Sequence, residues 1–205
     1  MVGGTLHGRT AAAQDRPVPG YRAVMRVVAG LAGGRRLRAP VGRQVRPTSE
    51  RVREALFNAL GSLDAVEGAA VLDLFAGTGA LGIEALSRGA ASAVFVDADA
   101  RAVAAIKANL RDTGLAERAR VVQADVLKYL AGGPAPVDVA FADPPYAFDG
   151  WPRLLAVLPA RLVAIEARSH VDLPDGWHPL RSKRYGDTVV TLASSAAPAP
   201  REEEG

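Results

Sequence analysis

The sequence of 205 residues contains no cysteine, and this absence excludes three kinds of chemistry. It rules out a disulfide framework, a zinc site built on thiolates, and a cysteine nucleophile. Aromatic residues make up only 5% of the chain, and the three histidines lack the spacing of metal ligands. We therefore expect no metal site.

Long hydrophobic runs are missing as well. No apolar stretch approaches the roughly 18 residues that span a bilayer, and no signal-peptide pattern opens the sequence. These absences predict a cytoplasmic protein without a membrane partner. The length fits one domain with an appendage, and the lack of domain-sized insertions favours a monomer.

The net charge of +3 is small but unevenly distributed. Residues 22–53 hold nine arginines and one glutamate, which gives this segment a net charge of +8. Residues 54–205 hold 14 basic and 20 acidic groups, for a net charge of −6. Clustered arginine neutralises phosphates and releases counterions, so the basic segment predicts a polyanionic partner. A compositional bias towards arginine is the alternative, although bias alone would spread arginine evenly.

The amino-terminal part divides into two segments. Residues 1–24 are small, polar and aperiodic, which predicts a disordered extension, and Met25 is an alternative start of the chain. Residues 26–30 and 35–38 flank a pair of glycines. This pattern predicts a small basic β-hairpin in an RNA-binding segment of residues 25–48.

Strand-like and helix-like segments then alternate, which predicts an α/β fold with a Rossmann-like, doubly wound, mostly parallel sheet. Residues 177–185 and 188–192 predict an antiparallel hairpin that closes this sheet. The main domain is thus expected at residues 49–195, and residues 196–205 are expected to form a disordered tail. The parallel strands are predicted at residues 71–75, 93–96, 120–123, 137–141 and 162–165.

A glycine-rich loop follows the first of these strands. Residues 77–82 fit the pattern G-x-G-x-x-G, and Asp97 closes the next strand, about 20 residues further on. Such glycines let the backbone approach a nucleoside-containing ligand, and the acid binds ribose hydroxyls. The pattern alone is equally typical of a nicotinamide-binding oxidoreductase, and a tight turn without a ligand is the structural alternative.

Two further acids favour a different nucleoside ligand. Asp73 lies inside the strand end, where dinucleotide sites usually carry apolar residues, and a carboxylate there suits the cationic amine of S-adenosylmethionine. Asp125 follows the third strand, where it is placed to accept a hydrogen bond from an adenine amine. Each has a structural alternative: Asp73 as the partner of a turn or a helix N-terminus, and Asp125 as a helix N-cap.

The motif Asp143-Pro144-Pro145-Tyr146 follows the fourth strand, at the edge of the sheet where ligands bind. The exocyclic amine of a nucleobase is a poor nucleophile, because its lone pair is delocalised into the ring. The Asp143 carboxylate and the Pro144 carbonyl can accept hydrogen bonds from both N–H groups of the amine and turn its lone pair towards a methyl donor. Asp143 can also act as the proton acceptor. Pro145 stiffens the turn, and Tyr146 offers a ring for base stacking. A plain Pro-Pro turn is the alternative.

In this order the motifs resemble the class I methyltransferases that use S-adenosylmethionine and methylate amines with a [DN]PPY motif. More narrowly, residues 25–193 resemble the RsmD-type 16S rRNA guanine-N2 methyltransferases. Besides Asp-Pro-Pro-Tyr, the resemblance is carried by residues 26–30, 46–58, 73–85 and 183–188. It implies methylation of N2 of guanine 966 of 16S rRNA, in the assembled or assembling small ribosomal subunit.

The resemblance also implies roles for individual residues in a methyltransferase domain. The predicted catalytic residues are Asp143, Pro144, Pro145 and Tyr146. The predicted S-adenosylmethionine-binding residues are Arg46, Thr48, Asp73, Phe75, Ala76, Gly77, Thr78, Gly79, Asp97, Ala98, Asp125 and Val126. The residues predicted to bind RNA are Arg26, Arg35, Arg36, Arg38, Arg43 and Arg184.

Three other functions stay open on the sequence alone. A DNA adenine-N6 methyltransferase more often has Asn at the position of Asp143 and a separate target-recognition segment, for which this chain has little room. A nicotinamide-binding oxidoreductase would be stabilised by NAD and not by S-adenosylhomocysteine. A non-catalytic RNA-binding protein has no use for acids at successive strand ends. Glu166, at the end of the fifth strand, is expected to orient a neighbouring arginine.

Overall fold

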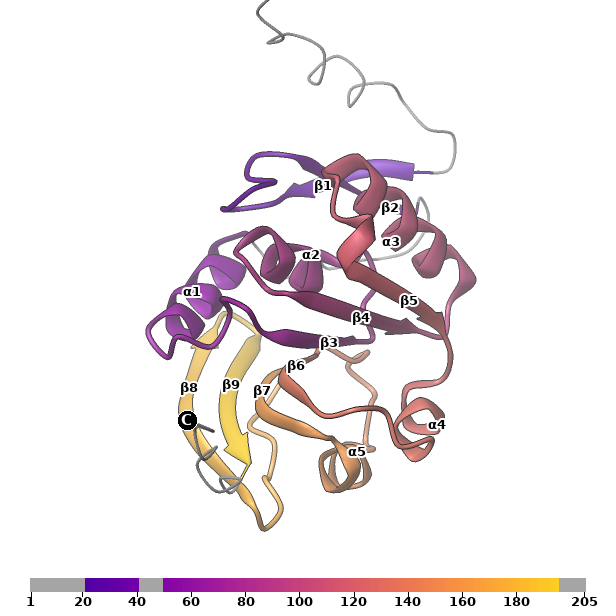
Figure 1. Cartoon of the computed structure of the whole chain (residues 1–205). Helices are drawn as coiled ribbons and strands as arrows, with labels where there is room; N and C mark the ends of the chain where they lie inside the picture. Colours follow the sequence, from indigo (N-terminus) through magenta and orange to yellow (C-terminus); the bar gives the residue numbers. More distant parts are fainter. Residues whose placement is uncertain (1–20, 41–49, 196–205) are drawn as a thin grey trace, which may run out of the picture.

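A computed structural model describes residues 21–40 and 50–195 of the chain, in which a seven-stranded sheet lies between two layers of helices (Figure 1). The spatial order of the strands is β5-β4-β3-β6-β7-β9-β8. Strands β3 to β7 are parallel, while β9 pairs antiparallel with β7 and β8 pairs antiparallel with β9. The predicted Rossmann-like sheet with an antiparallel closing hairpin is confirmed. The strands are β3 (Ala70–Leu74), β4 (Ser92–Asp97), β5 (Ala119–Gln123), β6 (Val137–Ala142), β7 (Ala160–Ala167), β8 (Trp177–Tyr185) and β9 (Thr188–Ser195).

Helices cover both faces because the side chains of each central strand alternate between two cores. Val71 of β3 and Phe141 of β6 pack into the core formed with α1, α2 and α3. Leu72 and Leu74 of β3 pack into the opposite core, with α4 and α5. The helices are α1 (Glu50–Gly61), α2 (Ala80–Ser87), α3 (Ala100–Thr113), the 3-10 turn η1 (Ala116–Arg118), α4 (Val126–Ala131) and α5 (Trp151–Val157).

A separate two-stranded hairpin, β1 (Tyr21–Arg26) and β2 (Arg36–Pro40), lies beside α3 (Figure 1). The predicted hairpin is present, but its first strand occupies residues 21–26 rather than 26–30. Part of the segment predicted to be disordered, residues 1–24, therefore belongs to β1. The strand is defined by its pairing, which aligns Tyr21 with Pro40, and its own sequence shows no alternating pattern. The rest of that segment and the predicted tail lie outside the described residues.

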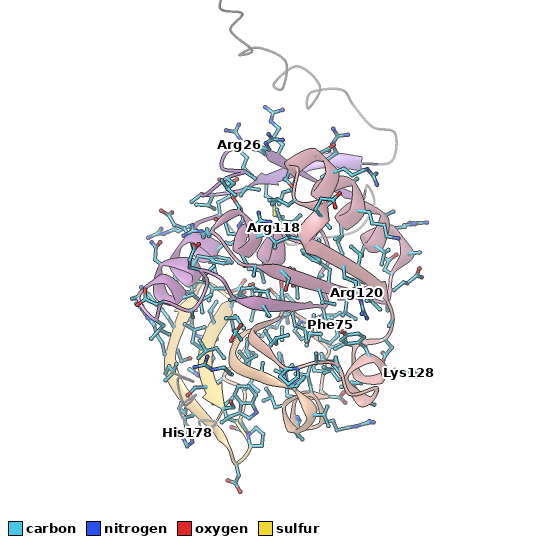
Figure 2. The ribbon with its side chains drawn as sticks, viewed as in Figure 1. Arg26, Phe75, Arg118, Arg120, Lys128 and His178 are labelled. Carbon is cyan, nitrogen blue, oxygen red and sulfur yellow. The ribbon has the colours of Figure 1, made fainter. Side chains whose placement is uncertain are left out.

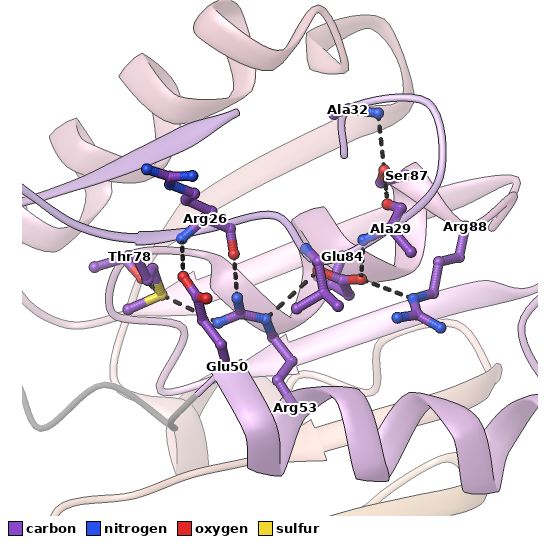
Figure 3. Close-up of polar contacts among 12 residues, drawn as sticks. Arg26, Ala29, Ala32, Glu50, Arg53, Thr78, Glu84, Ser87 and Arg88 are labelled. Carbon is purple, nitrogen blue, oxygen red and sulfur yellow. Dashed lines mark hydrogen bonds and ion pairs between the residues drawn. The ribbon is translucent and has the colours of Figure 1, made fainter. Parts of the chain in front are cut away.

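Glu84 of α2 is the centre of the contact between the hairpin and the main sheet domain (Figure 3). Its buried carboxylate accepts hydrogen bonds from the backbone N–H groups of Val28 and Ala29, at 2.7 and 3.0 Å. The Arg88 Nε donates to it at 2.7 Å, and the Arg53 Nε of α1 lies 3.5 Å away. Because burial of an unpaired charge is costly, these cations and donors are what permit a carboxylate at this position.

Arg53 is fully buried and connects α1 to the end of β1 (Figure 3). Its Nη2 donates to the carbonyl of Arg26, and its Nη1 lies 3.3 Å from the sulfur of Met25. Burial lowers the pKa of Arg53, and the opposing charges of Glu84 and Glu50 raise it. This arginine belongs to the basic segment of the sequence, yet its charge is used inside the protein.

The connection between β1 and β2 also rests on the last turn of α2. Ser87 Oγ accepts a hydrogen bond from the N–H of Ala32 at 2.9 Å, and the Ser87 carbonyl accepts one from Leu31 at 2.8 Å. Gly30 has a φ of +81°, and a Cβ at this position would lie 1.9 Å from the Ser87 carbonyl oxygen. The close approach of the two backbones therefore requires glycine at position 30.

Candidate active site

A cavity of about 710 Å³ lies at the carboxyl ends of the parallel strands, where ligands bind in sheets of this type. Its size is within the usual range of small-molecule sites. The loops after β3, β4, β5 and β6 contribute to its lining, and Glu166 contributes from β7. Most of the residues predicted for cofactor binding and catalysis are thus brought together.

The glycine loop and Asp97 form one side of the cavity, to which Phe75, Gly77 and Thr78 also contribute. Figure 2 shows Phe75 at the carboxyl end of β3, where its φ of +56° is uncommon for a residue other than glycine. Asp97 accepts hydrogen bonds from the N–H of Gly77 on Oδ2, at 2.8 Å, and of Asp99 on Oδ1, at 2.9 Å. These bonds fix the carboxylate, and each oxygen keeps a lone pair that can accept from a ligand hydroxyl. Ala98 lines the cavity beside it.

Asp73 lies outside the cavity lining, with only 2% of its surface exposed. Its Oδ2 accepts a hydrogen bond from the N–H of Gly82, at 2.9 Å, in the first turn of α2. Burial raises the pKa of Asp73 to about 8, the hydrogen bond from Gly82 opposes this shift, and the charge of Asp97 adds to it. The geometry favours the role of turn partner over direct contact with a ligand amine. Ala76 and Gly79 are also absent from the lining.

Asp125 lines the cavity and caps a helix at the same time. It is the N-cap of α4, and its Oδ1 accepts from the N–H of Lys128 at 2.9 Å. Val126 and Leu127 line the cavity next to it. The predicted position at the cavity and the alternative role as N-cap are therefore both present.

The four residues of the Asp-Pro-Pro-Tyr motif all line the cavity. Because β6 pairs with β3, the loop that carries this motif shares the cavity with the glycine loop. Tyr146 is 42% exposed, so much of its ring is open to contact. Asp143 and Pro144 precede this ring in the same short loop, so the two acceptors and the ring face one cavity.

An aromatic cluster on the cavity wall was missed by the sequence reasoning. Phe148 lines the cavity and contacts Phe75 edge-on, with ring centroids 5.1 Å apart, and it contacts Trp151 in the same way at 5.2 Å. No motif singles out Phe148, because its position depends on how its loop folds back against Phe75. The remaining lining residues that were not predicted are Asp99, Ala102, Leu127 and Ala147.

Two arginines predicted to bind RNA are used within the protein. Arg35 Nη1 donates to the carbonyl of Asp112 at 2.6 Å, and Arg38 Nε lies 3.3 Å from the Asp112 carboxylate. Both hold the hairpin on the last turn of α3, where cations are also favoured by the helix dipole. Arg26 and Arg36 are exposed on the hairpin, and Figure 2 shows Arg26 there, at the opposite end of the view from β8.

The other predicted residues lie elsewhere. Arg184 is exposed on β8, and its Nη1 donates to the carbonyl of Arg168 at 3.2 Å. Arg43, Arg46 and Thr48 lie outside the described residues. Over residues 21–40 and 50–195, no group of three or more acidic, histidine or cysteine side chains is placed to hold a metal ion. In those same ranges no helix is long and apolar enough to cross a membrane.

The carboxyl ends of the parallel strands place a glycine loop, an acid and an Asp-Pro-Pro-Tyr loop around one cavity. This arrangement defines a methyltransferase with a Rossmann-like fold. The model of the family described as Conserved hypothetical protein 95 matches residues 25–194. The chain belongs to this family.

Individual relatives agree with this assignment. The chain is 36% identical over 181 residues to YlbH of Bacillus subtilis, covering 82% of this chain and 97% of that protein. It is 33% identical over 180 residues to Ribosomal RNA small subunit methyltransferase D of Haemophilus influenzae, covering 82% and 92% of the two chains. The solved structure of yhhF from Escherichia coli is similar with a TM-score of 0.75 and 34% identity, covering 85% of this chain and 99% of that one.

Proposed function

We propose that this protein transfers a methyl group from S-adenosylmethionine to N2 of one guanine in 16S rRNA, namely guanine 966, which the resemblance to the RsmD-type enzymes implies. The observation that carries the proposal is the shared cavity of the glycine loop, Asp97 and the Asp-Pro-Pro-Tyr motif. The name of the Haemophilus influenzae relative supports ribosomal RNA of the small subunit as the substrate. The enzyme acts in the cytoplasm, as a monomer, on the assembled or assembling subunit.

The residues around the cavity fit S-adenosylmethionine by their chemistry. The Asp97 carboxylate, held by two backbone N–H groups, suits the ribose hydroxyls, while Asp125 and Val126 suit the adenine. A Cβ on Gly77 would have no neighbour closer than the Phe75 carbonyl at 3.8 Å, so the loop leaves open space at this point for a ligand. When bound, S-adenosylmethionine supplies an electrophilic methyl group on a sulfonium centre.

The Asp-Pro-Pro-Tyr loop prepares the amine for this electrophile. The Asp143 carboxylate and the Pro144 carbonyl accept hydrogen bonds from the two N–H groups of N2. These hydrogen bonds withdraw the nitrogen lone pair from conjugation with the ring. Asp143 then takes the proton that the amine loses as it becomes a secondary amine. Pro145 limits the motion of both acceptors, and Tyr146 holds the base by stacking. Most of the rate enhancement comes from this positioning.

The proposal is tested by incubating the protein with methyl-labelled S-adenosylmethionine and four substrates: small subunits lacking the modification, fully modified small subunits, naked 16S rRNA, and duplex DNA. Mass spectrometry then identifies the methylated nucleoside. We expect label in N2-methylguanosine of the unmodified subunits and none in the modified ones. Label in N6-methyladenosine of the DNA, or no label in any RNA, contradicts the proposal.

A further inference from the structure

Tyr146, the proposed stacking platform for the target base, is in contact with an arginine that no motif includes. The guanidinium carbon of Arg168 lies 4.2 Å from the centroid of the Tyr146 ring, in a cation–π contact. Arg168 directly follows β7, whereas Tyr146 follows β6. Two loops that are distant in sequence therefore meet at this ring.

The segment that carries Arg168 is tied down rather than free. Arg184 of β8 donates to the carbonyl of Arg168 at 3.2 Å. Two residues further along, His170 Nδ1 lies 3.1 Å from the hydroxyl of Ser182, also on β8. These contacts hold the start of the β7–β8 connection against the edge strand, so the Arg168 guanidinium is presented from a fixed backbone.

The position of Arg168 relative to the cavity indicates what the contact does. Tyr146 and Glu166 line the cavity, but Arg168 is not among its lining residues. The guanidinium thus contacts the ring of a lining residue without itself belonging to the lining. Because 42% of Tyr146 is exposed, its ring is only partly packed, and the contact with Arg168 adds a restraint that favours one orientation of the ring.

We propose that Arg168 is a positioning residue for the target base: it holds the Tyr146 ring in the orientation on which the base stacks. The inference rests on the proposed function, because it takes Tyr146 to be the stacking platform. A base held at the wrong angle presents its amine poorly to Asp143 and Pro144, and small errors in placement have large effects on rate. RNA affinity depends mainly on phosphate contacts and changes little when Arg168 is removed.

A double-mutant cycle tests this inference. Arg168→Ala is expected to lower kcat on unmodified small subunits about tenfold, while the affinity for S-adenosylhomocysteine and the salt dependence of RNA binding stay unchanged. In a Tyr146→Ala background the same substitution is expected to have no further effect, because the residue acts through the ring. Arg168→Lys keeps a cation near the ring and is expected to recover part of the rate.

Arg161→Ala is the matched control. Arg161 lies on β7 away from the cavity, and its exposed guanidinium pairs with Asp138 at 3.6 Å, so its loss is expected to leave kcat unchanged. An equal fall in kcat on both the wild-type and the Tyr146→Ala backgrounds overturns the positioning role. So does a weaker salt dependence of RNA binding in Arg168→Ala, which indicates a phosphate contact instead.

A measurement without substrate separates this inference from the proposed function. In an NMR spectrum of the protein with isotope-labelled tyrosine rings, the signal of Tyr146 is assigned as the one that disappears in Tyr146→Phe. Arg168→Ala is expected to move the chemical shift of that signal towards the value of a freely rotating ring. Arg161→Ala is expected to leave the chemical shift unchanged. An unchanged Tyr146 signal in Arg168→Ala overturns the inference, whereas a wild-type protein that methylates no RNA overturns the proposed function.

Discussion

Asp73 shows how one side chain links the glycine loop to the stability of the fold. Its carboxyl group is buried outside the cavity lining and accepts a hydrogen bond from the N–H of Gly82 in the first turn of α2. A Cβ on Gly82 would lie 2.4 Å from the ring of Phe95, so the helix, the acid and β4 meet at van der Waals contact. The sequence placed the acid correctly at the strand end, but its orientation depends on how closely α2 packs against the sheet.

The raised pKa of Asp73 makes stability depend on pH. Because burial raises this pKa to about 8, the folded protein holds the proton more tightly than the unfolded chain. The contribution to stability is full below the ordinary pKa of about 4 and is lost as the pH rises through about 8, at up to about 1.4 kcal/mol per pH unit. Asp73→Asn keeps an oxygen acceptor for Gly82 and is expected to flatten this dependence. Urea unfolding at several pH values between about 5 and 8 measures it, and parallel profiles for the two proteins contradict the account.

Gly30 is a second residue whose role only the structure reveals. Gly30→Ala is expected to destabilise the fold by about 2–4 kcal/mol, because the new Cβ meets the Ser87 carbonyl and the backbone is left-handed. Gly34→Ala is the control, since Gly34 has a φ of +80° and no atom within 4 Å of the position its Cβ would take. The control is expected to cost only the backbone strain, about 1–2 kcal/mol. Equal losses in thermal or urea unfolding would show that the contact with α2 is unimportant.

At the scale of elements, the buried pair of Arg53 and Glu84 connects α1, α2 and the hairpin. Arg53→Met is expected to destabilise the protein by about 3–5 kcal/mol, because Glu84 stays buried with less compensation. Adding Glu84→Gln removes that charge and is expected to recover part of the loss. Urea unfolding of the two single variants and the double variant gives the coupling energy. Strictly additive effects contradict the proposed electrostatic connection.

The hairpin arginines divide into two groups with different expected effects. Arg38→Ala removes an ion pair with Asp112 in which the arginine is 14% exposed, and it is expected to cost about 1 kcal/mol of stability. Arg26 is exposed, and Arg26→Ala is expected to leave stability unchanged. It is expected to lower, by about 0.7–0.9, the slope of the logarithm of RNA affinity against the logarithm of salt concentration. Binding titrations across salt concentrations, with thermal melting beside them, measure both. The same outcome for the two variants would remove this distinction.

The elements that were predictable are those with a strong local pattern. The parallel strands read as short apolar runs, so the sequence located them within a few residues. Four of them are largely buried, and β5, at the edge of the sheet, is only partly buried. Helices α4 and α5 have only six and seven residues and were not predicted, because so short a segment carries little periodicity. The first strand of the hairpin was predicted a few residues too late in the sequence, because the position of β1 is set by its pairing with β2 and by no pattern of its own.

On the scale of the whole molecule, the basic segment is less of a free surface than its net charge of +8 indicates. Arg53 is buried, and Arg35 and Arg38 bind the last turn of α3. A sequence count treats these arginines alike, because only packing distinguishes a structural guanidinium from one that faces a partner. Met25, Val27 and other apolar residues of the hairpin share the core of α1, α2 and α3, so the hairpin is an extension of that core.

The predicted catalytic motif and most of the predicted cofactor residues converge on one cavity, since parallel strands end at one edge of the sheet. Lining residues such as Phe148 could not be predicted from a motif, because their position depends on how their loops fold. Arg168 was missed for the same reason, because its contact with Tyr146 joins two loops that are distant in sequence.

The most direct test of the central claim is the rate at which Asp143→Ala methylates unmodified small subunits. In the proposed mechanism Asp143 both accepts a hydrogen bond from the amine and takes its proton, so we expect kcat to fall by about 10²–10⁴-fold. Binding of S-adenosylhomocysteine, measured by a thermal shift, is expected to persist and shows that the variant is folded. A variant that binds S-adenosylhomocysteine and methylates guanine N2 at the wild-type rate contradicts the account.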